Sequence, residues 1–337
     1  MSINECIYGV LNWDQLEHFC KRFNLKPSQI KTNFDGWRKL ILYTEDKVFL
    51  FPRDPNVIEW LDVEISAYEL LSDYKNLPVP LFIERVKDKQ ISYYDFAVVT
   101  RLKGLAYSKY EKEMTFDRLV KMLENLARLI TQWHEIPLQE IPKKIKKGAI
   151  FDETIYQWEI KILNKSTMKE AFDSAFEKLV EYIKTNVESS FELLTTEKTK
   201  ILLWNCLNEV VALKPVLIHS DIHEDQILID SLENMEITGI LDWETVRVGN
   251  PVWEFNFFEW GYGIWEWRKK FNELRRRMWK IYLEKRGIKL KNYEGLNAFY
   301  TLSEFLKSLD KPIANNEDSV ILSLEGLVEV IRELEKM

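Results

Sequence analysis

The pattern of apolar and polar positions gives the first hundred residues the character of a small β-rich unit. Two apolar runs, residues 40–43 and 48–51, flank the polar turn 44–47, and this arrangement predicts a hairpin. Similar patterns predict strands over 82–86 and 96–100, and helices over 14–22 and 57–73. We therefore expect a small antiparallel sheet with one inserted helix.

The pattern turns helical after Gly104. Residues 115–135 predict an amphipathic helix that begins after Thr115 as its N-cap, whereas the lysine run 143–147 predicts a solvated loop. Helical patterns cover 152–187, 196–212 and the chain after about 252, and short strands are predicted at 216–218, 227–229 and 237–241. We expect two domains, 1–103 and 104–337, joined by a hinge near 100–104, with the larger one mainly helical.

Composition and charge narrow the class of protein. The 337 residues are 46% apolar and 13% aromatic, which excludes intrinsic disorder, and the three widely spread cysteines exclude a disulfide scaffold. The net charge of −7 argues against a nucleic-acid partner. No apolar run approaches a membrane span, and the first residues lack the layout of a signal peptide. We therefore expect a cytoplasmic protein that acts on a small molecule, its oligomeric state left open.

The candidate chemistry lies between residues 217 and 245. Asp221 follows the first short strand, Gln226 precedes the second, and Asp242 lies sixteen residues beyond Gln226, at the end of the third. One aspartate can orient an attacking hydroxyl, while an amide oxygen and a second aspartate can hold Mg²⁺ on nucleotide phosphates. The hairpin of the second and third strands is predicted to bring Gln226 and Asp242 together.

These residues resemble the motifs of the aminoglycoside phosphotransferase and choline kinase superfamily, which shares the protein-kinase-like fold. That superfamily carries His-Gly-Asp with an Asn five residues after the Asp, then Ile-Asp-Trp/Phe, and then Gly-Asp-Pro with another acid. The matching segments here, in the same order, are 48–53, Glu64, 76–80, 100–104, 133–134, 219–226, 241–244 and 249–254. The resemblance covers about residues 30 to 260 and implies an α+β, two-lobed fold: a small antiparallel β-sheet lobe with one helix, and a larger helical lobe.

The resemblance also implies roles for individual residues. Asp221 would be the catalytic base, and Gln226 and Asp242 would bind Mg²⁺. The nucleotide, ATP or GTP, would be bound by Glu64 and by the hinge residues Thr100, Arg101, Leu102 and Lys103. His219 would shape the catalytic loop, and Glu254 matches a position that steadies it. Candidate contacts to a hydroxylated substrate, such as an aminoglycoside-like compound, amino alcohol or sugar, are His223, Glu224, Glu244 and Trp253.

Three departures from the motifs bear on activity. Gln226 replaces Asn and adds a methylene, and Ser220 replaces Gly, which is tolerable if its φ stays negative. Leu50 stands where the superfamily has the strand lysine that pairs with the helix glutamate and the phosphates. Arg53 or Lys39 could substitute, although strand alternation places Arg53 on the opposite face. The alternative to an active kinase is therefore a weak or inactive nucleotide- or metabolite-binding regulator.

Other interpretations of the sequence carry less weight. His219, Asp221 and His223 could suggest zinc, but the sequence offers no second ligand cluster. His223 is equally able to touch substrate or metal and to shape the loop. The aromatic residues around 253–267, with their neighbouring glutamates, suggest either a pocket for a cationic amine or, as is commoner, packing in the core. A protein kinase is disfavoured because no Asp-Phe-Gly or Ala-Pro-Glu segment occurs.

Overall fold

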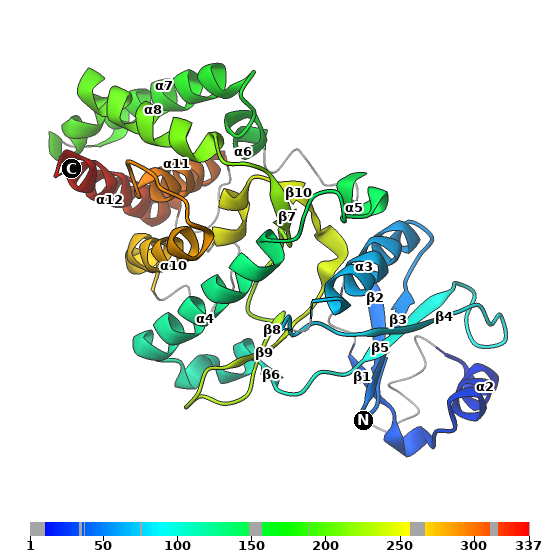
Figure 1. Ribbon diagram of the computed structural model, residues 1–337. Helices are drawn as coiled ribbons and strands as arrows, with labels where there is room; N and C mark the ends of the chain where they lie inside the picture. The colour runs from blue at the N-terminus through cyan, green and yellow to red at the C-terminus, as the bar shows by residue number, and fades with distance from the viewer. Residues whose placement is uncertain are drawn as a thin grey trace.

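The computed structural model describes residues 11–33, 36, 38–74, 76–147, 157–187, 189–256, 267–310 and 316–336. None of the helices in these segments combines the length and apolar character that a membrane span requires. Figure 1 shows the β-sheet of the N-terminal part at one end of the molecule and the bundle of later helices at the other.

A five-stranded antiparallel sheet forms the N-terminal part. Its strand order is β1-β2-β3-β5-β4, and β2 pairs with β3 so that Lys39 lies opposite Pro52 and Ile41 opposite Leu50. The strands are β1 (Lys31–Asn33), β2 (Lys39–Tyr43), β3 (Lys47–Pro52), β4 (Phe82–Val86) and β5 (Phe96–Thr100). The predicted strands are confirmed to within one residue at each end.

The two faces of this sheet pack against different partners. On one face Leu50 and its neighbours join the main core, beside helix α3 (Val57–Ser72). On the other face, helix α2 (Trp13–Phe23) inserts Phe19 against Phe49, with ring centroids 4.7 Å apart. Opposed residues of an antiparallel pair share a face, so Lys39 lies on the face of Leu50, toward α3.

The remainder of the chain is mainly helical, as predicted. The first α-helix after the hinge, α4 (Phe116–His134), begins after Thr115. The side chain of Thr115 accepts a hydrogen bond from the N–H of Arg118 at 3.4 Å. The other helices are α5 (Lys143–Lys147), α6 (Gln157–Ile162), α7 (Met168–Asn186), α8 (Glu197–Val211), α10 (Phe271–Arg286), α11 (Gly295–Asp310) and α12 (Asn316–Glu335). Their apolar faces enclose the main core. Together with the antiparallel sheet, this confirms the predicted two-part α+β fold.

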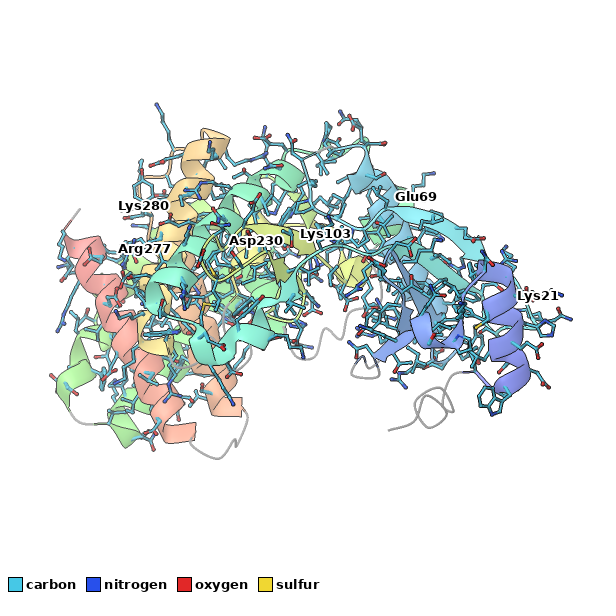
Figure 2. The ribbon with its side chains drawn as sticks, turned by 90° about the horizontal axis from the view of Figure 1, so that it is seen from below. Lys21, Glu69, Lys103, Asp230, Arg277 and Lys280 are labelled. Carbon is cyan, nitrogen blue, oxygen red and sulfur yellow. The ribbon has the colours of Figure 1, made fainter. Side chains whose placement is uncertain are left out.

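Two small sheets lie inside the helical part. One joins β6 (Leu105–Ala106), β8 (Ile227–Ile229) and β9 (Ile237–Ile240), and the other pairs β7 (Val216–Ile218) with β10 (Arg247–Gly249). Figure 2 places Lys103 and Asp230 between Lys21 of α2 at one end and Arg277 and Lys280 of α10 at the other. The segments that were predicted to carry the chemistry therefore lie where the two parts of the molecule meet.

The prediction of a loop at 143–147 was wrong. These residues form the short helix α5, in which Ile145 is fully buried and Lys144 lies 2.8 Å from a carboxylate oxygen of Asp62 on α3. In the sequence, four lysines surround Ile145, the single apolar residue whose burial anchors this helix, so the pattern did not indicate a buried position. The predicted helix over 152–187 is two helices, α6 and α7, and its first residues lie outside the described segments.

Candidate active site

The β8–β9 hairpin brings Gln226 and Asp242 together, as the sequence predicted. Ile227 is paired with Ile240, and the N–H of Leu241 donates to the carbonyl of Gln226 at 2.9 Å. The two candidate metal ligands therefore flank the same end of one hairpin. Asp242 has a left-handed backbone, with φ 63° and ψ 56°, which ends the strand and begins the short turn Trp243–Thr245.

The loop that carries Asp221 is fixed by His219. Burial lowers the pKa of His219, so the ring is neutral and has one donor and one acceptor nitrogen. Its Nε2 lies 2.8 Å from the carbonyl oxygen of Leu241, which can only accept, and its Nδ1 accepts the N–H of Asp221 at 3.4 Å. His219 thus ties Asp221 to the segment that precedes Asp242, which agrees with the shaping role expected of it.

Ser220 departs from the expectation of a negative φ. Its φ is +68°, a left-handed conformation that favours glycine. Two hydrogen bonds hold it there: its N–H donates to Glu254 at 2.9 Å, and its hydroxyl donates to the carbonyl of Thr245 at 2.8 Å. The loop therefore has the backbone conformation that glycine adopts easily, and these two hydrogen bonds stabilise it in a serine.

Glu254 hydrogen-bonds both to this loop and to helix α4. One carboxylate oxygen accepts the Ser220 N–H, and the other accepts the indole N–H of Trp133 at 3.0 Å. Burial opposes the charge of Glu254, but the neighbouring His134 and the Ser220 N–H favour it, and its pKa lies below the usual value. The position expected to steady the loop therefore contacts it directly.

Two substitutions at Ser220 should separate strain from hydrogen bonding. Ser220→Ala keeps the strained conformation and loses the bond to Thr245, so we expect it to lower the free energy of unfolding by about 1 kcal/mol. Ser220→Gly loses the same bond but relieves strain of about 1 kcal/mol, so its stability should stay near wild type. Urea unfolding of both variants measures the difference, and equal losses would contradict the argument.

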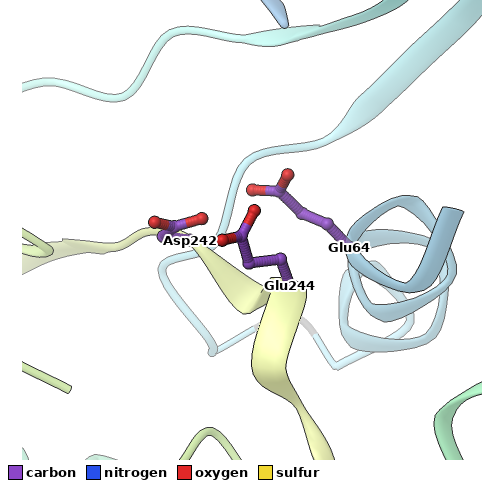
Figure 3. A group of neighbouring side chains, drawn as sticks. All are labelled: Glu64, Asp242 and Glu244. Atoms are coloured by element: carbon purple, nitrogen blue, oxygen red, sulfur yellow. The ribbon is translucent and has the colours of Figure 1, made fainter. Parts of the chain in front are cut away.

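Lys39 lies at the centre of a group of three carboxylates. Its Nζ is 2.6 Å from Glu64 on α3, 2.6 Å from Asp242 and 2.9 Å from Glu244. Figure 3 shows the three carboxylates pointing toward one another from helix α3 and from the segment after β9. Arg38 adds a second cation, 2.5 Å from the other oxygen of Glu244 and stacked on Trp60 at 4.1 Å. These contacts join the N-terminal sheet to the Asp242 segment.

The charges in this cluster set its protonation. Burial opposes the charge of Lys39, but the attraction of Asp242, Glu64 and Glu244 outweighs it and holds the pKa of Lys39 well above its usual value. Burial raises the pKa of Glu64 to about 7, whereas Lys39 holds the pKa of Asp242 below its usual value despite burial. The negative charge of Asp242 is therefore stabilised by the neighbouring ammonium.

The donor set around Gln226 and Asp242 fits a divalent metal. The side-chain oxygen Oε1 of Gln226 is buried and accepts no hydrogen bond in the part of the chain that the structure describes. An unsatisfied buried amide oxygen and an ionised carboxylate, both carried at the same end of the hairpin, are the kinds of oxygen ligand that Mg²⁺ prefers. The other group with metal-ligand spacing, Glu64, Asp242 and Glu244, surrounds the ammonium of Lys39, which already supplies a cation to all three.

The hinge residues are held by both parts of the molecule. The N–H of Arg101 donates to Asp46 at 2.8 Å, and the carbonyl of Lys103 accepts the hydroxyl of Thr238 at 2.7 Å. Leu102, between them, makes no backbone hydrogen bond to the described residues. Gly104 follows with φ +99°, and a Cβ there would lie 2.6 Å from the carbonyl oxygen of Ile229. The hinge is thus fixed through the N–H of Arg101 and the carbonyl of Lys103.

The predicted substrate contacts lie on three different segments of the chain. His223 is half-buried, and its Nδ1 accepts the N–H of Asp225 at 3.3 Å, a contact that shapes the loop. Trp253 is half-buried with the guanidinium of Arg247 4.5 Å from its ring. Glu224 is half-buried on the same loop as His223, whereas Glu244 is bound to Arg38 and Lys39 and would have to leave them to reach a substrate. The predicted pocket of aromatic and acidic side chains falls mostly in 257–266, outside the described residues.

Comparison with known proteins identifies the class. Residues 40–294 match the model of the phosphotransferase enzyme family, and the chain therefore belongs to this family. Among solved structures, the chain is similar to the GDP complex of aminoglycoside 2′-phosphotransferase-IIIa. The two sequences are 16% identical, the match covers 95% of this chain and 99% of the other, and the TM-score is 0.54. It is also similar to ADP-bound aminoglycoside phosphotransferase APH(2″)-Ib, with 15% identity over 96% and 99%, and a TM-score of 0.50. No curated protein matches the sequence. The predicted superfamily and its kinase-like fold are confirmed.

Some residues of the site were not predicted from the sequence. Lys39 was one of two candidate substitutes, and Arg38 and the Tyr68 hydroxyl, which donates to Glu64 at 2.8 Å, were not considered. A signal for Lys39 existed in the hairpin: with the turn at 44–47, Lys39 pairs opposite Pro52 and shares a face with Leu50. The candidate substitute Arg53 instead donates its Nε–H to the carbonyl of Gly36 at 3.1 Å.

Proposed function

We propose that this protein is a small-molecule kinase that transfers the γ-phosphoryl group of ATP or GTP to a hydroxyl. The observation that carries the proposal is that Gln226 and Asp242 flank one end of the β8–β9 hairpin, to which His219 ties the Asp221 loop. Membership of the phosphotransferase enzyme family supports it. So do the nucleotides named in the titles of its structural neighbours, GDP in one and ADP in the other.

The proposed roles follow from chemistry and position. Asp221 would accept or orient the proton of the acceptor hydroxyl, as its loop is fixed by His219. Gln226 and Asp242 would hold Mg²⁺, which neutralises charge on the phosphates when it is bound. Glu64 would position the ammonium of Lys39, and the backbone of Leu102 would contact the purine. The transfer needs no covalent intermediate on the protein, because positioning and electrostatic stabilisation supply the catalysis.

The acceptor is proposed to be polar and to carry an amine. The Asp221 loop also presents the carboxylate of Glu224, half-buried, and the chain carries a net charge of −7. Carboxylates beside an acceptor site attract ammonium groups. The structural neighbours named above act, by their titles, as aminoglycoside phosphotransferases. Amino sugars and amino alcohols are therefore the first acceptors to test.

A thermal-shift titration with ATP and GTP, each with and without Mg²⁺, tests the nucleotide site. A ligand that binds the native state at 100 times its Kd stabilises it by about 2.7 kcal/mol, which a melting curve resolves. We expect a shift with one or both nucleotides that grows with Mg²⁺, followed by phosphorylation of a hydroxylated amine in a substrate screen. Nucleotide binding without turnover in any condition would favour the alternative, a regulatory protein of this fold, and the absence of any shift would contradict the proposed function.

A further inference from the structure

Strand β3 supplies no cation to the candidate nucleotide site. Leu50, at the position where the superfamily motif has lysine, is 5% exposed and packs in the main core. Glu64 on α3 nevertheless has an ammonium partner at 2.6 Å, which comes from Lys39 on the neighbouring strand β2. The helix glutamate has therefore kept a charged partner while the strand that supplies it has changed.

The register of the hairpin explains how Lys39 reaches this place. Ile41 is opposite Leu50 and Lys39 is opposite Pro52, so Lys39 and Leu50 are diagonal neighbours on one face of the sheet. Diagonal neighbours lie about 7–8 Å apart, a distance that a lysine side chain spans. An ammonium group can therefore reach the same point beside Glu64 from either position.

The two other cationic side chains considered for this place, Arg53 and Arg38, bind other groups. Arg53 lies just after β3 and bonds the carbonyl of Gly36. Arg38 is half exposed, stacks on Trp60, and contacts only the outer oxygen of Glu244 among the three carboxylates. Within the described residues, Lys39 is the one cation that contacts Glu64, Asp242 and Glu244 together.

We propose that Lys39, from β2, is the cation that binds the phosphate oxygens of the nucleotide, in place of a lysine on β3. This inference rests on the proposed function. Glu64 accepts a hydrogen bond from the ammonium at 2.6 Å and Glu244 lies 2.9 Å from it, and they would keep it in place while the N–H now directed at Asp242 turned to a phosphate oxygen. The same exchange would free Asp242 for the metal. The positive charge that the superfamily carries at position 50 is then supplied from β2, and the chain remains competent for turnover.

Labelling of the wild-type protein tests this without any variant. An acyl-phosphate derivative of ATP or GTP carries a reactive carbonyl carbon where the phosphates bind. A lysine ammonium beside it first gives up a proton, and the resulting amine attacks this carbon. The bond from the carbon to the phosphate oxygen breaks, the nitrogen loses a second proton, and the acyl group remains on nitrogen as an amide while the nucleotide leaves. We expect peptide mass spectrometry to find the label on Lys39, and excess unlabelled nucleotide to suppress it. Labelling at other lysines alone, in a protein that binds the nucleotide, would overturn the inference.

Moving the charge tests its role in turnover. Lys39→Met should lower nucleotide hydrolysis to water by about a hundredfold, the loss typical of removing one preorganised electrostatic contact. Lys39→Met combined with Leu50→Lys should regain at least tenfold of that loss, because the new lysine reaches the same point. Lys47→Met is the matched control: Lys47 is on β3 but points to the other face and pairs with Asp46, so hydrolysis should be unchanged.

The outcomes separate the inference from the function on which it rests. A wild-type protein that neither binds nor hydrolyses ATP or GTP would refute the proposed function. A wild-type protein that hydrolyses nucleotide while Lys39→Met does so equally well would refute the role of Lys39 alone. Because Lys39→Met leaves buried carboxylates without their cation, its melting temperature is measured first, and the labelling result stands if that variant does not fold.

Discussion

Replacing Asp221 by Asn is expected to lower phosphoryl transfer to the acceptor by about 10³-fold, the middle of the range for a positioned general base. The change removes the charge that orients the acceptor proton and keeps the size of the side chain. The loop should keep its shape, because its contacts run through the Asp221 N–H and through Ser220 rather than through the carboxylate alone. Turnover with a confirmed acceptor, followed as phosphate transfer, measures the effect.

The control lies four residues further along the same loop. Asp225 is exposed, and its carboxylate accepts the hydroxyl of Ser108 at 2.6 Å. We expect Asp225→Asn to keep turnover within a few-fold of wild type, and Asp221→Asn to keep the nucleotide-induced thermal shift. If Asp221→Asn retained wild-type turnover, the assignment of Asp221 as the base would be wrong.

The strands and motifs were predictable from the sequence because local chemistry determines them. The hairpin of β2 and β3 combines two apolar runs with a polar turn, and the observed strands begin and end within one residue of the prediction. The juxtaposition of Gln226 and Asp242 followed from the strand pairing of a short hairpin, and the N–H of Leu241 confirms it. These features depend on neighbours close in sequence or on one strand pair.

The source of the cation was predictable only in part: the hairpin register puts Lys39 on the face of Leu50, but no local pattern shows which face meets α3. Residues 39–43 read Lys-Leu-Ile-Leu-Tyr, in which apolar residues occupy both faces, so alternation does not reveal which face is buried against α3. The contact of Lys39 with Asp242 joins residues about two hundred positions apart and depends on how the two parts of the molecule meet. The conformation of Ser220 likewise depends on distant Glu254 and Thr245.

Exchanging Asp242 for Asn is expected to abolish the effect of Mg²⁺ on nucleotide binding and to lower turnover by at least about 10³-fold. The variant loses the carboxylate that we assign to the metal, and Gln226 alone offers a neutral oxygen. Hard divalent cations bind anionic oxygen ligands far better than amides, so the Mg²⁺-dependent part of the thermal shift should vanish.

The same substitution should also cost stability. The ammonium of Lys39, 2.6 Å from Asp242, holds the pKa of that carboxyl below its usual value, so at neutral pH the ionised form stabilises the folded protein. Asp242→Asn keeps the size of the side chain and loses this charge, and we therefore expect a lower melting temperature without ligand. Asp230→Asn, an exposed site on the β8–β9 turn, should keep the Mg²⁺ effect. A ligand-free melting temperature equal to or above that of wild type would contradict this charge argument. A retained Mg²⁺ shift would place the metal on other residues.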